Sequence, residues 1–396
     1  MLPLTGVTIL AVEQYGAGPF GSMLCGDLGA DVIKIEPPGG EGELGRRVGP
    51  HFFAPGDSHF FQAFNRNKRS ITLDLKSAEG ADILRRLATG ADAVLNNLRG
   101  DQPEKLGLTY AQLAAVNPRI VCAHLSAYGR TGSRRSWPGF DYLMQAEAGY
   151  LSVTGEPDGP PSRRGLSIVD FMTGLMTVFA MTSSIIGARA SGRGQDVDVS
   201  LFDTALHNLS YLSVWYLSNG HVQGREPRSG HPSLVPSQLY RTQDGWIFIM
   251  CNKENFWAPL CEVIGRPEWV HDARYATFKA RLDNRDELNR LLDEALSART
   301  TDAWMTVFAG KVPAAPVLDI AQALDNPFVA EREGVRSFAR SPQEGEVRML
   351  ASPIRVPGET LPTRAAPGLG AHTEEVLRGL GLGEADIAKL RANGIV

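Results

Sequence analysis

The sequence predicts an α/β protein in which a large domain with a parallel sheet is followed by a smaller α+β domain. Short β-rich runs alternate with helical patterns over residues 1–125, and this alternation is typical of βαβ units. The composition changes at the Gly- and Pro-rich stretch 224–236, beyond which a hairpin signal introduces a different arrangement. The length of 396 residues also exceeds one ordinary core, so two domains are expected.

The elements of the first domain follow from the spacing of its apolar residues. β-rich runs predict strands at residues 7–12, 31–35, 70–73, 93–96 and 120–124. Helical periodicity between them predicts helices at 19–28, 78–88 and 110–116. After the loop-rich stretch 126–167, we expect a long apolar helix over 169–188, a strand at 197–200 and one helix over 202–219.

The second domain is marked by two strands that flank Asp244-Gly245, a dipeptide typical of a hairpin turn. Helical patterns follow at 254–264, 285–295 and 302–308. The tail carries helices near 373–378 and 384–392, which are expected to return to the first domain. The predicted boundaries are 1–205 for the large domain, 206–228 for a linker, 229–325 for the small domain and 326–396 for the returning segment.

The composition excludes several classes of function. Hydrophobic residues make up 43% of the chain, charged residues 21%, and the net charge is -4, so neither nucleic acid nor a membrane surface is an expected partner. The four cysteines form no C-x-x-C pair, which argues against a zinc ribbon and a disulfide scaffold and for a reducing compartment; no metal is expected. The first residues lack the pattern of a signal peptide, and we therefore expect a cytoplasmic protein.

One uncharged stretch, residues 171–188, is close to the minimum length of a membrane span. It contains several threonines and serines and is preceded directly by an aspartate. These polar groups favour a helix buried in the core of a soluble protein.

A G-x-G-x-x-G pattern is formed by Gly16, Gly18 and Gly21 after the first predicted strand. With Glu36 at the end of the next strand, it favours dinucleotide binding and hence an NAD-dependent oxidoreductase. Against this, three further residues, 13–15, separate the strand from the first glycine, and no hydride-transfer residues are recognisable downstream. A site for another anion at the helix N-terminus, or a tight turn without a ligand, remain alternatives.

Several segments together resemble the family III CoA-transferases, which include formyl-CoA and carnitine CoA-transferases, and the related α-methylacyl-CoA racemases. They are LTGVTILAVEQYGAGPFGSMLCGDLGADVIKIEPPGG, NRNKRSITLDLKSAEG, PGFDYLMQAEAG, SIVDFMTGL, SGRGQDVDVSLFDTAL and SGHPSLVPSQLYRTQDGW. The resemblance implies an interlocked homodimer whose large domain carries a Rossmann-like, CoA-binding layer. It further implies that acyl-CoA and a free carboxylic acid are the substrates and that no cofactor is tightly bound.

The family's catalytic aspartate matches Asp170, in the segment SIVDFMTG. The resemblance implies that its carboxylate forms a mixed anhydride with the acyl group and then a thioester with CoA. The position at the start of a long helix is expected to favour the ionised form, because the helix dipole stabilises negative charge there. Position alone also fits a plain N-cap.

The resemblance assigns further residues to the site. Backbone amides near Gly16 and Ala17, and in the loop at Gly230 and His231, are expected to stabilise the oxyanions. The CoA contacts carried over by position are Gly16, Ala17, Leu73, Asp74, Leu75, Lys76, Asn97, Leu98, Arg99, Lys105, Phe140 and Asp141.

The choice of substrate rests on departures from the family pattern. Gly16 and Pro37 stand where formyl-CoA transferases carry a glutamine and an arginine, which argues against oxalate as the acceptor. Arg46 or Arg47 is predicted to pair with a second carboxylate, which favours a dicarboxylic acceptor such as succinate or a branched C5 diacid. A racemase is the alternative within the superfamily, but Phe140 occupies the position of its proton-shuttling histidine.

Overall fold

The computed structural model describes residues 1–340 and 345–396, which form two compact units. The first unit comprises residues 1–148, 165–210 and 328–396, and the second comprises 149–164 and 211–327. The predicted large domain had included 149–164. In the structure, Arg225 ties this loop to the second unit, because its Nη1 donates to the carbonyl oxygens of Glu156, Gly159 and Pro160 at 3.0, 2.6 and 3.0 Å.

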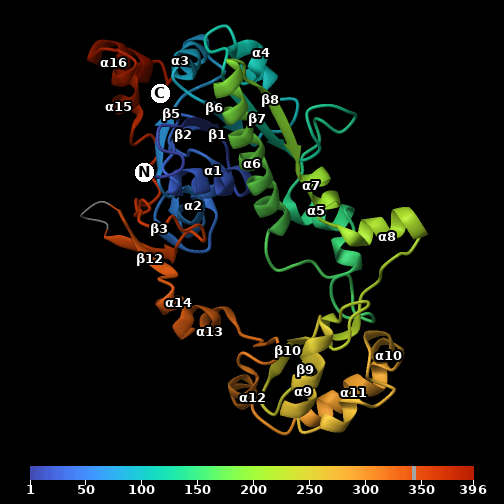
Figure 1. The fold of residues 1–396 in the computed structure, drawn as a ribbon. Coiled ribbons are helices and arrows are strands. Elements are labelled where there is room, and N and C mark those ends of the chain that lie inside the picture. Colours follow the sequence, from blue (N-terminus) through green and yellow to red (C-terminus); the bar gives the residue numbers. More distant parts are fainter. Residues whose placement is uncertain (341–344) are drawn as a thin grey trace. The chain divides into compact units, whose positions relative to one another are not determined.

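A six-stranded parallel sheet is the centre of the first unit (Figure 1). Its spatial order, β5-β2-β1-β6-β7-β8, corresponds to the 3-2-1-4-5-6 order of doubly wound dinucleotide-binding folds. The strands are β1 (Thr8–Val12), β2 (Asp31–Glu36), β5 (Lys68–Thr72), β6 (Ala93–Asn96), β7 (Val121–Ser126) and β8 (Gln195–Ser200). The predicted α/β class with a parallel sheet is therefore confirmed.

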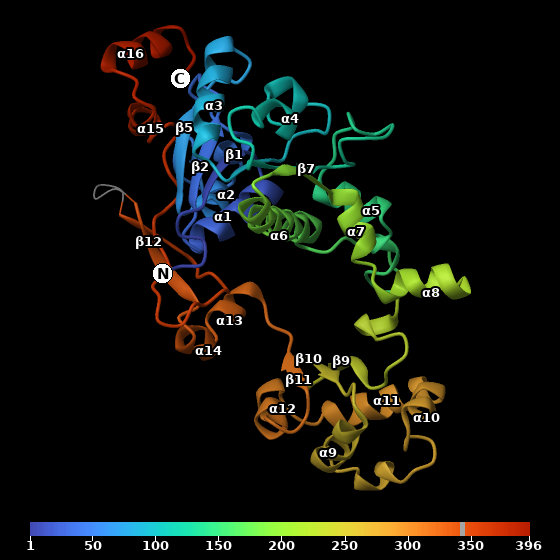
Figure 2. The ribbon, with the colours of Figure 1, turned by 45° about the horizontal axis from the view of Figure 1, so that its top comes forward.

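Helices cover both faces of this sheet, which explains why its strands are apolar on both sides. Ile9 and Ala11 of β1 face α1 (Ala17–Asp27) and α6 (Ile168–Ser191), whereas Leu10 and Val12 face α3 (Ala78–Thr89) and α4 (Tyr110–Leu113). Figure 2 views α6 nearly end-on beside α1. The two helices make the most extensive helix–helix contact of the unit.

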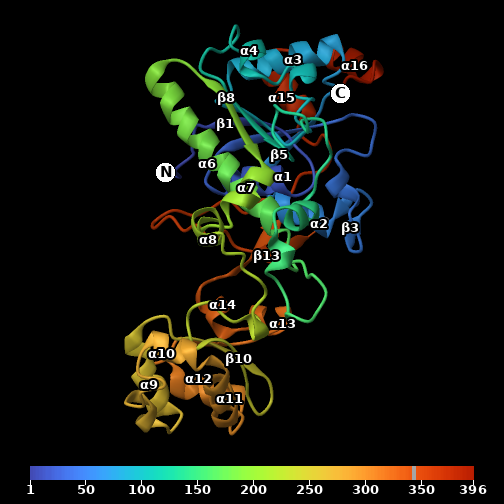
Figure 3. The ribbon, with the colours of Figure 1, turned by 90° about the vertical axis from the view of Figure 1, so that its right-hand side faces the viewer.

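The tail returns to the first unit and packs beside α3 (Figure 3). Its helices are α15 (Thr373–Gly379) and α16 (Glu384–Ala392), whose Leu377 and Ile387 join the core on the α3 face of the sheet. The Asp74 amide also donates to the Ile395 carbonyl oxygen at 2.8 Å. The end of the chain thus covers the edge strand β5.

The structure differs from the sequence-based prediction in several elements. The helix expected over 202–219 is two helices, α7 (Leu201–His207) and α8 (Tyr211–Asn219), because Ser210 adopts a φ of 51° that ends the helical hydrogen bonding. Short elements without a strong periodic signal were missed. They are β3 (Phe52–Ala54), β4 (Asp57–Ser58), α2 (His59–Asn65), α5 (Asp141–Glu147), α10 (Phe278–Asp283), β11 (Ala314–Pro316), α13 (Ile320–Leu324), α14 (Pro327–Glu331), β12 (Val335–Ala339) and β13 (Glu346–Leu350).

The second unit contains a three-stranded antiparallel sheet in the order β11-β10-β9. β9 (Ser237–Arg241) and β10 (Trp246–Met250) form the hairpin predicted around Asp244-Gly245. Four helices pack against them: α9 (Trp257–Val263), α10 (Phe278–Asp283), α11 (Arg285–Leu296) and α12 (Thr301–Phe308).

Within residues 1–340 and 345–396, α6 is the one helix long and apolar enough to cross a membrane. One face of α6 is buried against α1 and the sheet, with Val178, Met181 and Ile185 in the core. On its other face Phe179 and Ile186 are exposed. The helix expected to be buried is therefore buried on one side only in the single chain.

Candidate active site

The catalytic candidate Asp170 lies where the N-termini of α1 and α6 meet. Glycines allow this close approach: a Cβ on Gly174 would lie 2.4 Å from the Ala17 carbonyl oxygen, and one on Gly21 would lie 2.7 Å from that of Gly174. At the N-terminus of α1, a Cβ on Gly16 would lie 2.8 Å from Asp170 Oδ2. The Asp170 carboxylate thus lies against the backbone at Gly16, where any larger residue would collide with it.

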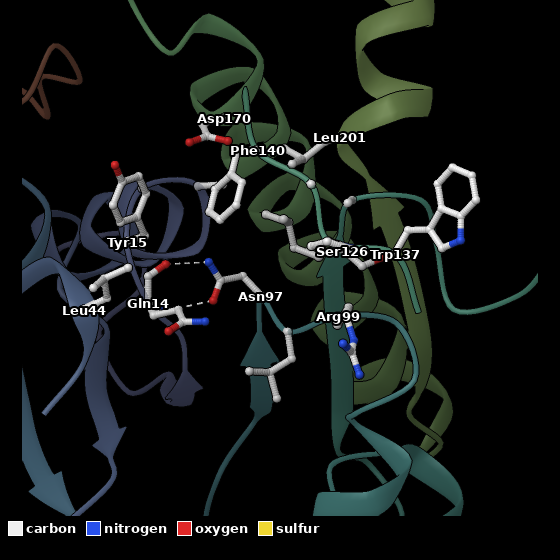
Figure 4. A pocket seen from close by; sticks show the side chains of 17 residues that line it. Gln14, Tyr15, Leu44, Asn97, Arg99, Ser126, Trp137, Phe140, Asp170 and Leu201 are labelled. Atoms are coloured by element: carbon white, nitrogen blue, oxygen red, sulfur yellow. Dashed lines mark hydrogen bonds between the residues drawn. The ribbon is translucent and has the colours of Figure 1, made fainter. Parts of the chain in front are cut away.

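The turn between β1 and α1 is held by hydrogen bonds from outside the turn. Gln14 N donates to Asn97 Oδ1 at 2.8 Å, and Asn97 Nδ2 donates to the Gln14 carbonyl oxygen at 2.6 Å (Figure 4). Asn97 directly follows β6, the neighbour of β1 in the sheet. The carboxyl ends of two adjacent parallel strands are therefore joined at this point, where ligands bind in open α/β sheets.

A pocket of about 240 Å³ opens at this edge of the sheet (Figure 4). It is lined by Gln14, Tyr15, Gly16, Ala17, Leu44, Asn97, Leu98, Arg99, Leu125, Ser126, Ala127, Trp137, Pro138, Gly139, Phe140, Asp170 and Leu201. The amides at the start of α1 have no partner within the helix and favour a negatively charged oxygen nearby. A carboxylate and a potential oxyanion site thus share one pocket.

Asp170 is nearly buried, with 7% of its surface exposed. Burial, and then the negative charge of Asp141, raise its pKa from 3.8 to about 7. The expectation that the helix start keeps this carboxylate ionised is therefore wrong in direction. The N-cap alternative is also wrong, because α6 begins at Ile168, after Ser167, and Asp170 lies inside its first turn.

Asp141 contacts the start of α6 through its side chain. Its Oδ2 accepts the Asp170 amide at 3.0 Å, and its Oδ1 accepts Gln145 Nε2 at 2.5 Å. The side chain therefore satisfies one of the free amides of the first turn of α6 while placing a second carboxylate beside Asp170.

The structure brings seven of the predicted site residues into the pocket. They are Gly16, Ala17, Asn97, Leu98, Arg99, Phe140 and Asp170. Sequence reasoning missed the other lining residues, of which Gln14 and Tyr15 had a visible signal. These polar residues separate the strand from the first glycine, the same feature that argues against an NAD site.

The remaining predicted CoA contacts lie outside this pocket. Leu73 is a core residue, and Leu75 packs against the same core. The Lys76 amide donates to Asp74 Oδ1 at 3.0 Å in the turn after β5. Lys105 is exposed and forms an ion pair with Asp101, at 2.8 Å, a partner that it shares with Arg99.

Arg46 does not present a free charge to a substrate. It is 2% exposed, and its Nε and Nη2 donate to the two carboxylate oxygens of Glu36, both at 2.7 Å. The predicted contact of Arg46 with a second substrate carboxylate is therefore not supported. Glu36, the candidate ribose ligand of the NAD alternative, is occupied by the same pair. Arg47 is more exposed and bonds to Glu41.

Gly230 and His231 lie in the second unit, where they line a separate cavity of about 430 Å³. His231 Nδ1 accepts the amides of Ser233 and Leu234 at 3.1 and 3.2 Å. Burial, with a contribution from Arg285, lowers the His231 pKa. Since Nδ1 accepts these amides, the proton of the neutral ring is on Nε2.

Residues 4–373 match the family described as CoA-transferase family III. The chain belongs to this family. Over 95% of both chains it is 33% identical to the succinate–glutarate CoA-transferase of Agrobacterium fabrum, and over 90% of both it is 34% identical to the acetyl-CoA:oxalate CoA-transferase of Acetobacter aceti. A CaiB/BaiF family protein from Brucella suis has a similar structure, with a TM-score of 0.81 and 34% identity over 96% of this chain and 99% of the other.

The family membership identifies this protein as a CoA-transferase and not as an NAD-dependent oxidoreductase. The G-x-G-x-x-G pattern is therefore not an NAD-binding signature in this chain. It forms the turn between β1 and α1, whose residues Gly16 and Ala17 line the pocket.

Proposed function

We propose that this family III enzyme moves CoA from an acyl-CoA to a free carboxylic acid through covalent intermediates on Asp170. The observation that carries the proposal is the position of this carboxylate. It is nearly buried, with a pKa raised to about 7, and it lies against Gly16 at the free N-terminus of α1. A desolvated carboxylate is a stronger nucleophile once ionised, because it lacks the hydration that weakens it in water.

In the first half-reaction, an Asp170 oxygen attacks the thioester carbonyl carbon and CoA leaves as the thiolate, which gives a mixed anhydride. The thiolate then attacks the Asp170 carbonyl carbon, so that the donor acid leaves as a carboxylate and an aspartyl-CoA thioester remains. The acceptor carboxylate attacks this thioester, and the released thiolate takes the acceptor acyl group from the second anhydride. Amides near Gly16 and Ala17 stabilise each oxyanion, an effect of about 3 kcal/mol per well-placed donor.

We further propose that the acceptor is a dicarboxylic acid. The relatives from Agrobacterium fabrum and mouse are named for succinate or succinyl-CoA and glutarate, which supports this class of acid. Since Arg46 is paired with Glu36, Arg47 is the remaining candidate among the two arginines for the second carboxylate. The predicted CoA contacts after β5, and the oxyanion-stabilising amides predicted at Gly230 and His231, also stay proposals.

An acceptor screen tests the substrate class. The enzyme is incubated with succinyl-CoA or acetyl-CoA and a panel of mono- and dicarboxylic acids, and the new acyl-CoA is detected by mass. We expect dicarboxylic acceptors to react with the higher kcat/KM, and Arg47→Ala to reduce that advantage. Arg163→Ala, which changes an exposed arginine of the second unit, should leave it unchanged. Exchange of the α-proton of acyl-CoA with D₂O, without transfer to any acid, would instead indicate a racemase.

We also propose that the chain forms the interlocked homodimer of its family and acts in a reducing compartment, the cytoplasm. Exposed apolar side chains on α6 and α8 support the dimer, among them Phe179, Ile186 and Leu217. The four cysteines are buried free thiols, which suits a reducing compartment. Light scattering is expected to give twice the mass of the chain, and differently tagged dimers are expected not to exchange subunits without unfolding. A monomer at assay concentration would contradict the proposed dimer.

A further inference from the structure

A cluster of buried charges lies beneath the turn that carries Gly16. It consists of Glu13, Lys34, Glu43 and Lys68, all of which are buried. Lys68 Nζ donates to Glu13 Oε1 at 2.7 Å, and Lys34 Nζ donates to the Glu13 carbonyl oxygen at 3.0 Å. Lys34 Nζ also lies 3.4 Å from Glu43 Oε1. The charges therefore balance within the cluster, as buried charges require.

Glu43 connects this cluster to the turn. Its Oε2 accepts the Tyr15 amide at 3.0 Å and the Gly45 amide at 2.5 Å. Its own amide donates to Glu36 Oε2 at 3.2 Å, so the backbone that carries the side chain is held in place as well. The Glu43 carboxylate is therefore fixed by the Tyr15 amide of the turn, by the Gly45 amide of its own segment and by the nearby Lys34 ammonium.

Tyr15 needs such support because its φ is 65°, a left-handed conformation that is unfavourable for residues other than glycine, asparagine and aspartate. The next residue is Gly16, which lies against Asp170 Oδ2. A change of backbone angle at Tyr15 would therefore move Gly16 and the first amides of α1 relative to the nucleophile. Asn97 forms hydrogen bonds with the backbone of Gln14, whereas the Tyr15 amide donates to Glu43.

We propose that Glu43 is a positioning residue for the acyl transfer: by holding the Tyr15 amide, it keeps the turn in the left-handed conformation that sets Gly16 and the α1 amides against Asp170. The inference rests on the proposed role of Asp170 but adds a residue that does not touch the reacting atoms. A role in stability alone is the competing explanation, and kinetic measurements separate the two.

Replacement of the carboxylate tests the proposal. In Glu43→Leu the Tyr15 amide loses its acceptor, and we expect kcat to fall about fivefold, the factor that corresponds to the unfavourable left-handed conformation. The KM for acyl-CoA is expected to change less than kcat, because other predicted CoA contacts, such as Leu98 and Arg99, lie outside the turn. Glu43→Gln retains an oxygen that can accept the amide, so it should recover part of the lost kcat.

A double-mutant cycle with Tyr15→Gly gives the sharper test, since glycine adopts positive φ without strain. We expect Glu43→Leu to reduce kcat less in the Tyr15→Gly background than in the wild-type background. The same factor in both backgrounds would overturn the proposal. If Glu43→Leu does not fold, the cycle is run with Glu43→Gln, for which the same two outcomes apply.

Asp27→Asn is the matched control. Asp27 is also buried on α1 and pairs with Arg66 at 2.6 Å, but it makes no contact with the turn. We expect it to lower Tm while leaving kcat near the wild-type value. If it lowers kcat as much as Glu43→Leu at an equal loss of Tm, Glu43 acts through stability and the proposal is wrong. Formation of the CoA adduct on wild-type Asp170 is measured alongside; its absence would contradict the proposed function instead.

Discussion

Asp170→Ala is expected to lower the rate of CoA transfer by at least about a thousandfold, because no other group can form the anhydride and the thioester. Among residues 1–340 and 345–396, Asp170 is the one carboxylate that lines the pocket. The steady-state rate of new acyl-CoA formation measures the loss. Mass analysis after a single turnover should show a CoA adduct on the wild-type peptide that contains Asp170 and none on the variant.

Asp203→Asn is the control for this variant. Asp203 also lies in the first turn of a helix, α7, but it is exposed and does not line the pocket. It should transfer CoA at close to the wild-type rate. Transfer by Asp170→Ala at the wild-type rate would contradict the covalent mechanism.

Asp170→Ala is also expected to be more stable than the wild type above pH 7. The folded-state pKa of Asp170 is raised, from 3.8 to about 7, so between about pH 4 and pH 7 the folded protein binds a proton that the unfolded chain has already lost. The contribution of Asp170 to stability is therefore fully present below pH 4 and is lost as pH rises towards 7. Asp170→Ala removes this loss, and urea titrations at several pH values should show a smaller decline in its free energy of unfolding.

Asp141→Asn is expected to shift the acid limb of the pH–rate profile to lower pH. In the wild type, kcat/KM should rise with pH up to about 7, as the Asp170 carboxylate ionises. An amide at position 141 removes the nearby negative charge but keeps an oxygen for the Asp170 amide. We expect the limb to move down by about one pH unit, so that near pH 5.5 the variant is faster than the wild type by up to about tenfold.

The pH–rate profile of a second variant on the same helix is the control. Glu147→Gln alters a carboxylate on the same helix, α5, that bonds to Tyr128 and Arg134 and does not line the pocket. Its acid limb should match the wild type. An unchanged limb in Asp141→Asn would mean that the Asp141 charge does not act on Asp170. Burial, the larger cause of the raised pKa, would then account for all of it.

The sequence alone was sufficient for the α/β class and for the family, because these depend on patterns within short segments. Strands such as β1 are apolar on both faces, and turns such as the Asp244-Gly245 hairpin carry their own signal. The segment around Asp170 also identified the catalytic candidate without any structure. Periodicity and turn chemistry act between residues that are close in the chain, so they can be read directly.

Tertiary structure decided the charge state and the partners of the same residues. Arg46 or Arg47 is predicted to bind substrate, and the structure pairs Arg46 with Glu36. Asp170 is expected to be ionised, yet burial and Asp141 raise its pKa. The contact of Glu43 with the Tyr15 amide joins residues 28 positions apart. Hydrogen bonds, ion pairs and desolvation depend on which segments meet in space, and a single sequence does not contain those distances.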